Sequence, residues 1–256
     1  MGNIKVDRDH LTGTVIPALF ANPVGILEYG NLGHSSKVDE LSDLMENGAV
    51  AGLAKLIEQI LSGMSDASPE NIARKPRMLV RLLGKHLEAQ VRYQVARSSL
   101  EQLLEEAQSK AKGVRETVSA INRLIEQHAS DVDALQEYIQ AGHAFLHDNP
   151  EAGAVQAGAL EFDRPRERFA RKLSNLATLL ASHELSINQM KLSRAQAIDL
   201  LDRFEETVSI LLPVWRQHTL TLITTKNMSP DMVAAASKAH QALVHSLSAS
   251  LDGIKH

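Results

Sequence analysis

Apolar residues recur at alternating spacings of four and three along the second half of the chain, a pattern typical of a coiled-coil seam. The pattern begins at Phe169 and continues to Trp215, and only His183 and Arg194 within it are polar. Its positions are Phe169, Leu173, Leu176, Leu180, His183, Ile187, Met190, Arg194, Ala197, Leu201, Phe204, Val208, Leu211 and Trp215. A register kept over about six heptads predicts one long helix whose stripe is covered by a partner helix. Because Pro213 has no backbone N–H, we expect a kink near the end of this helix.

A second stripe with the same alternation predicts an earlier long helix, from about residue 77 to residue 129. Its positions are Leu100, Leu104, Ala107, Ala111, Val114, Val118, Ile121, Ile125 and His128. Ser130 and Asp133 have the spacing of a capping box, which predicts that a separate helix begins there. Two long helices joined through a short helix and a loop pair most simply as an antiparallel hairpin.

The flanking segments show other patterns. Residues 1–35 are rich in Gly, Asn and Pro without a helical period, and they predict an irregular N-terminal arm. Residues 36–76 predict short helices, and residues 229–256 predict one C-terminal helix. The predicted fold is therefore all-α: an elongated, coiled-coil-like antiparallel hairpin of long helices over residues 77–225, with a small bundle of N- and C-terminal helices.

Composition supports this fold class and removes several kinds of chemistry. Of the 256 residues, 44% are apolar and only 4% are aromatic, a balance that favours helices over strands. The absence of Cys excludes disulfides, thiolate metal sites and cysteine-based catalysis. The sequence shows neither a secretory signal pattern nor a charge-free apolar stretch of membrane-spanning length. We therefore expect a cytoplasmic protein, with membrane association as the alternative.

Charge along the chain is uneven. The net charge of −4 argues against nucleic acid as a partner. Basic residues nevertheless dominate between residues 74 and 97, where Arg74, Arg77, Arg81 and Lys85 are candidate contacts to a partner or to an anionic membrane. The simpler interpretation of this segment is a solvated, dipolar helix surface.

The two polar residues within the stripe from Phe169 to Trp215 have two interpretations. His183 and Arg194 are expected to fix the register of the helices or the oligomeric state, including a homodimer, and the alternative is an internal anion site. The basic residues between Arg164 and Lys172 are interleaved with acidic ones, so we interpret them as local salt bridges rather than an oxyanion site.

Candidate catalytic or metal-binding residues are few. His143 and His147 stand four apart on a predicted helix and are weak metal candidates, because a metal site would need further ligands, for which His128 and Asp148 are the nearby choices. Two polar residues near a helix end are the simpler interpretation. No phosphate-binding glycine loop or nucleophile elbow is present in the sequence, so we expect neither a cofactor nor an enzymatic activity.

Several motifs between residues 77 and 225 resemble the TelA/KlaA toxic-anion (tellurite) resistance family of bacterial and plasmid proteins. The most specific are Leu-Pro-Val-Trp-Arg-Gln at residues 212–217 and Tyr-Ile-Gln-Ala-Gly at residues 138–142. Further matches are Val-Arg-Tyr-Gln at 91–94, the stretch 121–135, Arg-Phe at 168–169, Lys-Leu at 172–173 and Gln-Met-Lys-Leu at 189–192. The chain is similar in length to the compact plasmid-borne branch. The resemblance implies a role in tellurite resistance, plasmid maintenance or fertility inhibition, and it implies no catalytic residues.

Three hypotheses follow. The first is a non-enzymatic interaction protein that binds a host or plasmid protein through an exposed apolar patch near Trp215 and Arg216 or near the N-terminal arm. The second is a peripheral membrane protein that uses the basic segment 74–97. The third, which we favour least, is a metal-dependent detoxifying enzyme centred on His143 and His147.

Overall fold

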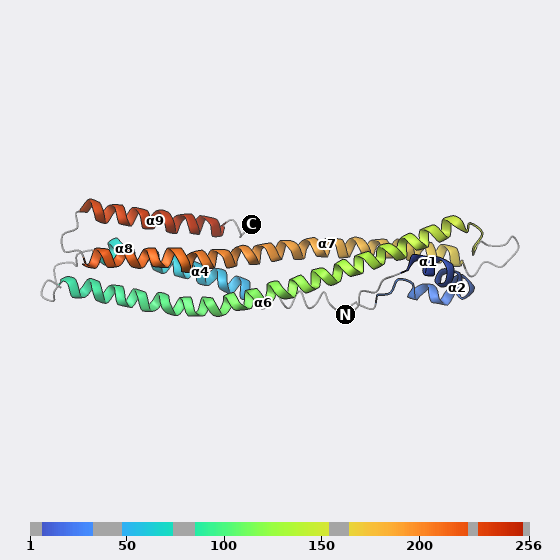
Figure 1. The fold of residues 1–256 in the computed structure, drawn as a ribbon, viewed down its shortest axis with the longest axis horizontal. Coiled ribbons are helices and arrows are strands. Elements are labelled where there is room, and N and C mark those ends of the chain that lie inside the picture. The colour runs from blue at the N-terminus through green and yellow to red at the C-terminus, as the bar shows by residue number, and fades with distance from the viewer. Residues whose placement is uncertain (1–6, 33–47, 74–84, 154–163, 225–229, 253–256) are drawn as a thin grey trace. The chain divides into compact units, whose positions relative to one another are not determined.

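Every regular element in the described part of the chain is helical in the computed structural model of the protein (Figure 1). The described residues are 7–32, 48–73, 85–153, 164–224 and 230–252. The elements are α1 (Arg8–His10), the π helix η1 (Leu11–Val15), α2 (Ile16–Ala21), the 3-10 helix η2 (Pro23–Glu28), α4 (Ala49–Asp66), α5 (Pro69–Ala73), α6 (Lys85–Asp148), α7 (Pro165–Glu206), the π helix η4 (Thr207–Leu211), α8 (Leu212–Thr224) and α9 (Pro230–Asp252). The predicted all-α class is confirmed.

The contacts divide the chain into two compact units. Unit 1 comprises residues 1–38 and 120–193, and unit 2 comprises residues 39–119 and 194–256. Both α6 and α7 contribute to each unit. The division therefore cuts across the segment 77–225, which the sequence pattern had suggested to be one core.

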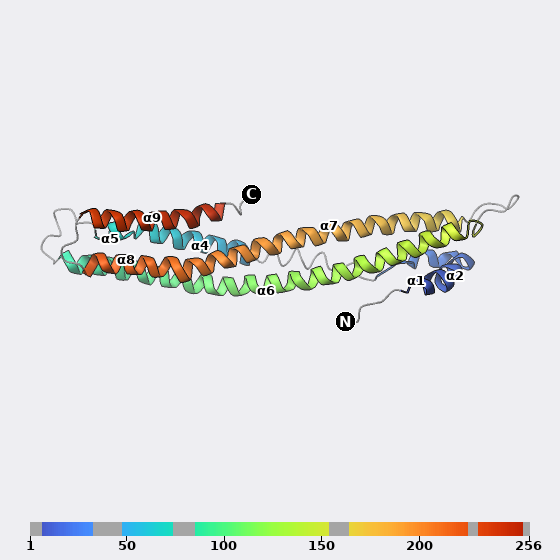
Figure 2. The same ribbon diagram turned by 45° about the horizontal axis from the view of Figure 1, so that its top comes forward.

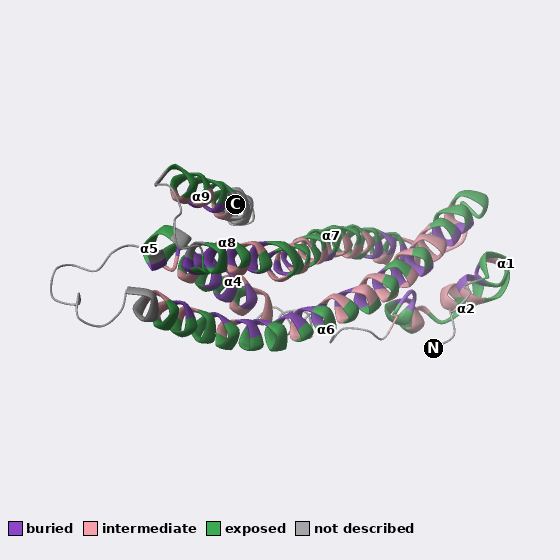
Figure 3. Cartoon of the chain, turned by 60° about the vertical axis from the view of Figure 1, so that its left-hand side comes forward, coloured by how far each residue is buried: buried purple, intermediate pink, exposed green. Residues whose placement is uncertain are grey.

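Both apolar stripes are covered, as the alternating spacing predicts. Each position of the two stripes is buried or half-buried, and none is exposed. The buried positions form a narrow band on each long helix, with exposed residues on the opposite side (Figure 3). A spacing of four and three returns the side chain to the same side of the helix every two turns, which is why the band stays continuous.

In unit 1, the C-terminal part of α6 packs antiparallel to the N-terminal part of α7. Gly142 of α6 lies against Leu173, and His128, four turns earlier on α6, lies against His183, farther along α7. The two helices share an apolar core whose buried members are Leu11, Ile16, Ile26, Tyr29, Leu135, Ala141, Phe145, Phe169, Leu173 and Leu176. The predicted antiparallel pairing of the two long helices is confirmed in this unit.

In unit 2, the same pairing continues with other helices packed around it. Arg115 bonds to Glu205 and Glu101 bonds to Arg216, so the chain directions are again opposite. The helices α4, α5 and α9 pack together and onto α8 (Figures 1 and 2). The predicted small bundle of short N- and C-terminal helices is therefore present, built from residues 49–73 and 230–252.

The long helix α6 does not end at residue 129, as the capping box at Ser130 and Asp133 had predicted. It continues without interruption to Asp148. Capping preferences are worth about 1 kcal/mol, and no Gly or Pro forces an end at this point. The apolar positions Ile121 and Leu135 on either side are both buried, and Leu135 belongs to the core of unit 1, so packing outweighs the capping signal.

The prediction of an irregular arm over residues 1–35 is wrong for residues 8–28, which form four short helical elements. Asp7 begins them by accepting a hydrogen bond from the N–H of Asp9 at 3.1 Å. The segment is tied to α6 by the ion pair of Arg8 with Glu137 at 2.9 Å. Because the helix type changes from α to π to α to 3-10, no single period runs through the sequence, and the pattern concealed the helices.

A π turn precedes Pro213 in the last long helix, and the predicted kink there stays a prediction. The five residues before α8 form the π turn η4, and the N–H of Leu212 bonds to the carbonyl of Thr207. A proline ring crowds the carbonyl four residues earlier, and a π turn widens the helix at that position. Helical structure then continues through Pro213 to Thr224.

Candidate functional site

Trp215, which the sequence suggested as an interaction residue, lies inside unit 2. Its side chain is fully buried, its indole Nε1 donates a hydrogen bond to the carbonyl of Ala67 at 2.8 Å, and its ring stacks on Tyr93 with 5.6 Å between centroids. A partner therefore has no access to the indole, and the interpretation of Trp215 as a direct contact is wrong. The residue instead joins the end of α4 to α6 and α8.

Arg216, the neighbouring candidate, is held in a small charge network. Its Nη2 lies 3.1 Å from Oε1 of Glu101, which also receives a 2.7 Å bond from Nε of Arg97. The hydrogen bond from Arg97 lowers the pKa of Glu101, and the same bond raises the pKa of Arg97. One carboxylate thus partly neutralises two of the cations near this end of α6.

The other basic candidates are not described to the same extent. Arg74, Arg77 and Arg81 lie outside the described residues, and Lys85 begins α6 with a side chain that the structure does not describe. The role suggested for them stays a prediction.

A groove runs beside the buried Trp215, between the end of α4 with α5 and the first described turns of α6. It has a volume of about 430 Å³. Its lining residues are Gly63, Asp66, Ala67, Asn71, Ile72, Val91, Arg92, Val95, Ala96, Ser99 and Leu100. Val91 and Val95, one helical turn apart on α6, are 55% and 66% exposed. The groove thus has an apolar floor and two unusually exposed β-branched side chains on one wall.

Local sequence fixes the other wall of the groove. Ser68 stands just before Pro69, and its Oγ accepts a hydrogen bond from the N–H of Asn71 at 3.3 Å, as expected for an N-cap. The side chain of Asn71 donates to the carbonyl of Asp66 at 3.1 Å. These two bonds satisfy backbone groups at the junction of α4 and α5, and they hold the corner in one geometry.

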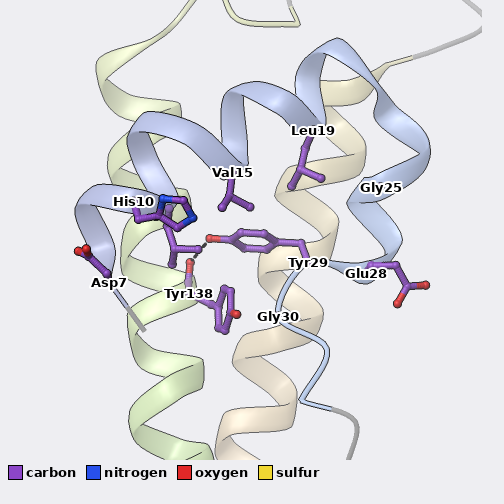
Figure 4. Close-up of a pocket in the computed structure, with 10 residues that line it drawn as sticks. Asp7, His10, Val15, Leu19, Gly25, Glu28, Tyr29, Gly30 and Tyr138 are labelled. Atoms are coloured by element: carbon purple, nitrogen blue, oxygen red, sulfur yellow. Dashed lines mark hydrogen bonds between the residues drawn. The ribbon is translucent and has the colours of Figure 1, made fainter. Parts of the chain in front are cut away.

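A second hollow, in unit 1, lies under the N-terminal segment (Figure 4). Its volume is about 450 Å³, and Tyr29 and Tyr138 meet in it edge to face, with 5.1 Å between ring centroids. The Tyr29 hydroxyl donates to the carbonyl of Tyr138 at 2.8 Å. Burial raises the pKa of Tyr29 well above its usual range, so the phenol stays protonated and is unsuited to act as a base. No periodic signal in the sequence marks this hollow, because most of its lining lies in residues 7–30, where the helix type changes repeatedly, and Tyr138 comes from α6.

The two polar positions of the last stripe have different surroundings. His183 is half-buried, and its Nδ1 lies 2.9 Å from Nδ1 of His128, the last position of the first stripe. One ring must donate and the other accept. Arg194 is half-buried and belongs to unit 2. The placement of His183 inside the helix pair agrees with an internal polar position, while its effect on register or oligomeric state stays a prediction.

The weak metal candidates lie on the surface of α6. His143 and His147 are both exposed, and Nδ1 of His147 lies 2.9 Å from the carboxylate of Asp148. His128, a suggested further ligand, contacts His183 instead. Across the described ranges, the structure shows no group of three or more His, Cys, Asp or Glu residues able to hold a metal ion.

The basic residues at the start of α7 only partly form the predicted salt bridges. Arg164 pairs with Glu167 at 3.1 Å, as expected. Arg166 instead donates to the carbonyls of Leu146 at 2.7 Å and Asn149 at 2.8 Å, and so it satisfies groups at the end of α6. The sequence pattern could not show this, because carbonyl acceptors are present at every residue.

Comparison with known proteins adds one relative of nearly full length. Over 251 residues, the chain is 60% identical to a protein of Escherichia coli called Protein KlaA, and the alignment covers 98% of both chains. No protein-family model matches the sequence. No solved structure matches it either.

Proposed function

This chain belongs to the KlaA family, and we propose that it is a non-enzymatic helical interaction protein that binds a partner protein through the groove of unit 2. The resemblance of its motifs to the TelA/KlaA family supports a role in resistance to tellurite and other toxic anions. The same resemblance supports the extension of this role to plasmid maintenance or fertility inhibition.

The observation that carries the proposal is the exposed apolar wall at Val91 and Val95. A soluble helix normally turns such side chains inward, and these two lie one turn apart beside an apolar hollow. A groove between helices accepts the apolar face of another helix, whose anchors recur every three or four residues. The proposed occupant is therefore an amphipathic helix of a partner protein encoded by the host or a plasmid.

Two features favour binding over catalysis. The conspicuous buried phenol, Tyr29, is held protonated, and the surface pair His143 and His147 has no further ligand beside it in the described part of the chain. The first arrangement does not supply a general base, and the second does not supply the ligand set of a metal site.

The alternative of a membrane protein acting through residues 74–97 gains less support. Within this segment Arg97 is tied to Glu101, which lowers its availability to lipid. As a separate observation, none of the described helices combines the length and the apolar character that a membrane span requires. A location in the cytoplasm is part of our proposal.

The test places a photo-crosslinking residue at Val95 in cells that carry the gene, with Ile210 as the matched position. Ile210 is also an exposed apolar residue of unit 2, at 52%. We expect a specific adduct from position 95 only. The captured protein is then purified, and V91E/V95E should weaken its binding at least about tenfold, while I210E should not.

Tellurite resistance of the same cells should fall with V91E/V95E and persist with I210E. Isothermal calorimetry of the purified chain with tellurite should show no stoichiometric binding. Full resistance in the V91E/V95E cells, or a stoichiometric tellurite site, would overturn the proposal. Adducts between copies of this chain would identify a homodimer as the occupant and would also overturn it.

A further inference from the structure

The 3-10 helix η2 of unit 1 presents two protruding apolar side chains. Val24 is 77% exposed and Leu27 is 72% exposed, the highest values among the large apolar residues that the structure describes. Residues three apart in a 3-10 helix eclipse one another, so both side chains lie on the same side of η2. Ile26, only 3% exposed, anchors the opposite side in the core. The result is a short apolar ridge on a firmly attached turn.

Cations of α7 border this ridge. Leu27 shares a shallow hollow of about 330 Å³ with Arg168, Arg171 and Lys172. Nζ of Lys172 donates to the carbonyl of Leu27 at 2.7 Å, and Nη2 of Arg168 donates to the carbonyl of Pro23 at 3.2 Å. These bonds fix both cations beside η2, and the neutral carbonyl of Leu27 does not compensate the charge of Lys172.

Acidic residues nearby are engaged elsewhere. The carboxylate of Glu28 accepts a hydrogen bond from Asn31 at 3.1 Å and borders the other hollow of unit 1 (Figure 4). Glu167 pairs with Arg164. Among the described residues, no carboxylate lies within ion-pair distance of Arg171 or Lys172. The ridge therefore carries exposed apolar groups and open positive charge together.

We propose that this surface docks unit 1 onto an anionic lipid membrane, with Val24 and Leu27 entering the headgroup region and Arg171 and Lys172 facing lipid phosphates. Apolar side chains that protrude beside cations match an interface where acyl chains lie just below a plane of negative charge. A free oxyanion would make no favourable contact with the apolar side chains of Val24 and Leu27. An acidic protein segment would need an apolar groove to cover them, and the shallow hollow beside Leu27 is lined mainly by polar side chains.

This inference is independent of the groove in unit 2 and names different residues from the segment 74–97. It assigns the membrane contact to η2 and the start of α7. For the start of α7, the sequence pattern had predicted only local salt bridges.

The experiment is flotation of the full chain with vesicles of phosphatidylcholine containing about 30% phosphatidylglycerol, at about 0.05 M and 0.5 M salt. We expect retention on these vesicles at low salt, little retention on pure phosphatidylcholine, and loss at high salt. R171Q removes one positive charge and breaks no ion pair with a described residue. It should weaken retention about fivefold, and R171Q/K172Q about twenty-fivefold. V24S/L27S should weaken it on the same vesicles.

Matched controls come from the same unit. R123Q removes an exposed charge from α6, and L185S removes an exposed apolar residue from α7. Both should float like the unchanged chain, and circular dichroism checks that every variant is folded. Equal retention on neutral vesicles, or anionic retention that R171Q and V24S/L27S leave unchanged, would overturn the proposal.

Two competitors separate lipid from the other anionic ligands. Millimolar inorganic phosphate that displaces the chain at constant ionic strength would indicate a simple oxyanion site. Polyglutamate that displaces it at equal charge concentration would indicate an acidic protein partner. Either displacement would contradict the lipid assignment.

Discussion

Unit 1 and unit 2 are built on the same two long helices, yet their cores differ. In unit 1 the core is aromatic: Phe20 lies 5.3 Å from Phe145 and 5.5 Å from Phe169 between ring centroids, and Tyr29 contacts Tyr138 and Phe169. In unit 2 the core is largely aliphatic, and its aromatic contact is the stack of Tyr93 on Trp215.

The covering segments account for the difference. Unit 2 is covered by α4 and α9, and α4 is long enough to bury a row of apolar side chains, among them Leu53, Ile57 and Ile60. Unit 1 is covered by elements of three to six residues, in which few side chains can face the core. Large rings supply more buried area per residue, so they compensate for short elements. The surfaces differ as a consequence: long helices leave a groove, and the short turn η2 leaves a protruding ridge.

The largest effect that separates the units is expected from truncation of their central aromatic residues. W215A should cost about 3–5 kcal/mol of unfolding free energy in unit 2, and F169A a similar amount in unit 1, because both side chains are fully buried. Urea unfolding gives the total loss. Hydrogen exchange should show W215A loosening α4 and α5, and F169A loosening residues 8–28. Equal loss of protection in both units with either variant would mean that they unfold as one.

Two helical glycines sharpen the comparison of packing. A Cβ at Gly142 would clash with Cδ2 of the buried Leu173, so G142A should destabilise unit 1 by about 1–3 kcal/mol. At Gly52 in unit 2, the nearest neighbours are the flexible side-chain atoms of Lys110 at 3.4 Å. G52A should therefore be neutral or stabilise by up to about 1 kcal/mol through helix propensity. Thermal unfolding of both variants checks the opposite signs, and equal shifts would contradict them.

Variants of His128 and His183 test whether these two side chains form a hydrogen bond within one chain in unit 1. H183L should cost about 1 kcal/mol because His128 loses a hydrogen-bond partner, and H128L/H183L should recover most of it. Light scattering should give one mass for the unchanged chain, for H183L and for H183L/R194L. A change of mass would instead assign His183 and Arg194 to the oligomeric state.

The smallest effect concerns pH in unit 2. His240 is fully buried, and its ring bonds through Nε2 to the carbonyl of Met64 at 3.2 Å. Burial lowers its pKa, with a further decrease from His218, although the bond to Met64 opposes this. The unfolded chain therefore takes up the proton first as pH falls below about 6.5, and folded unit 2 loses stability between that pH and the lower folded pKa.

H240Q keeps an N–H donor without the titration, so its unfolding free energy should vary less between about pH 8 and pH 5 than that of the unchanged chain. H245Q, at an exposed position of the same helix, should keep the original dependence. Indistinguishable pH profiles of H240Q and the unchanged chain would refute the assignment to His240.

Particular residues show how far the sequence could be interpreted. The two stripes predicted which positions of α6 and α7 are covered, and Ser68 with Pro69 predicted the start of α5. The sequence also named Trp215 as an interaction candidate, but the structure buries the indole and exposes Val91 and Val95 on the wall of the neighbouring groove. Exposure depends on which other element covers a side chain, and a pattern along one helix does not contain that information.

By itself, the sequence determined the helical class and the two covered stripes, because a repeat of seven residues places side chains on one side of a helix. It also determined the antiparallel pairing, because a short connection between two long helices favours a hairpin. Tertiary structure alone decided that α6 continues past Ser130, that residues 8–28 become helical, and that His128 meets His183. Each of these outcomes depends on contacts between residues far apart in the chain, whose packing energy exceeds the small local preferences of caps and turns.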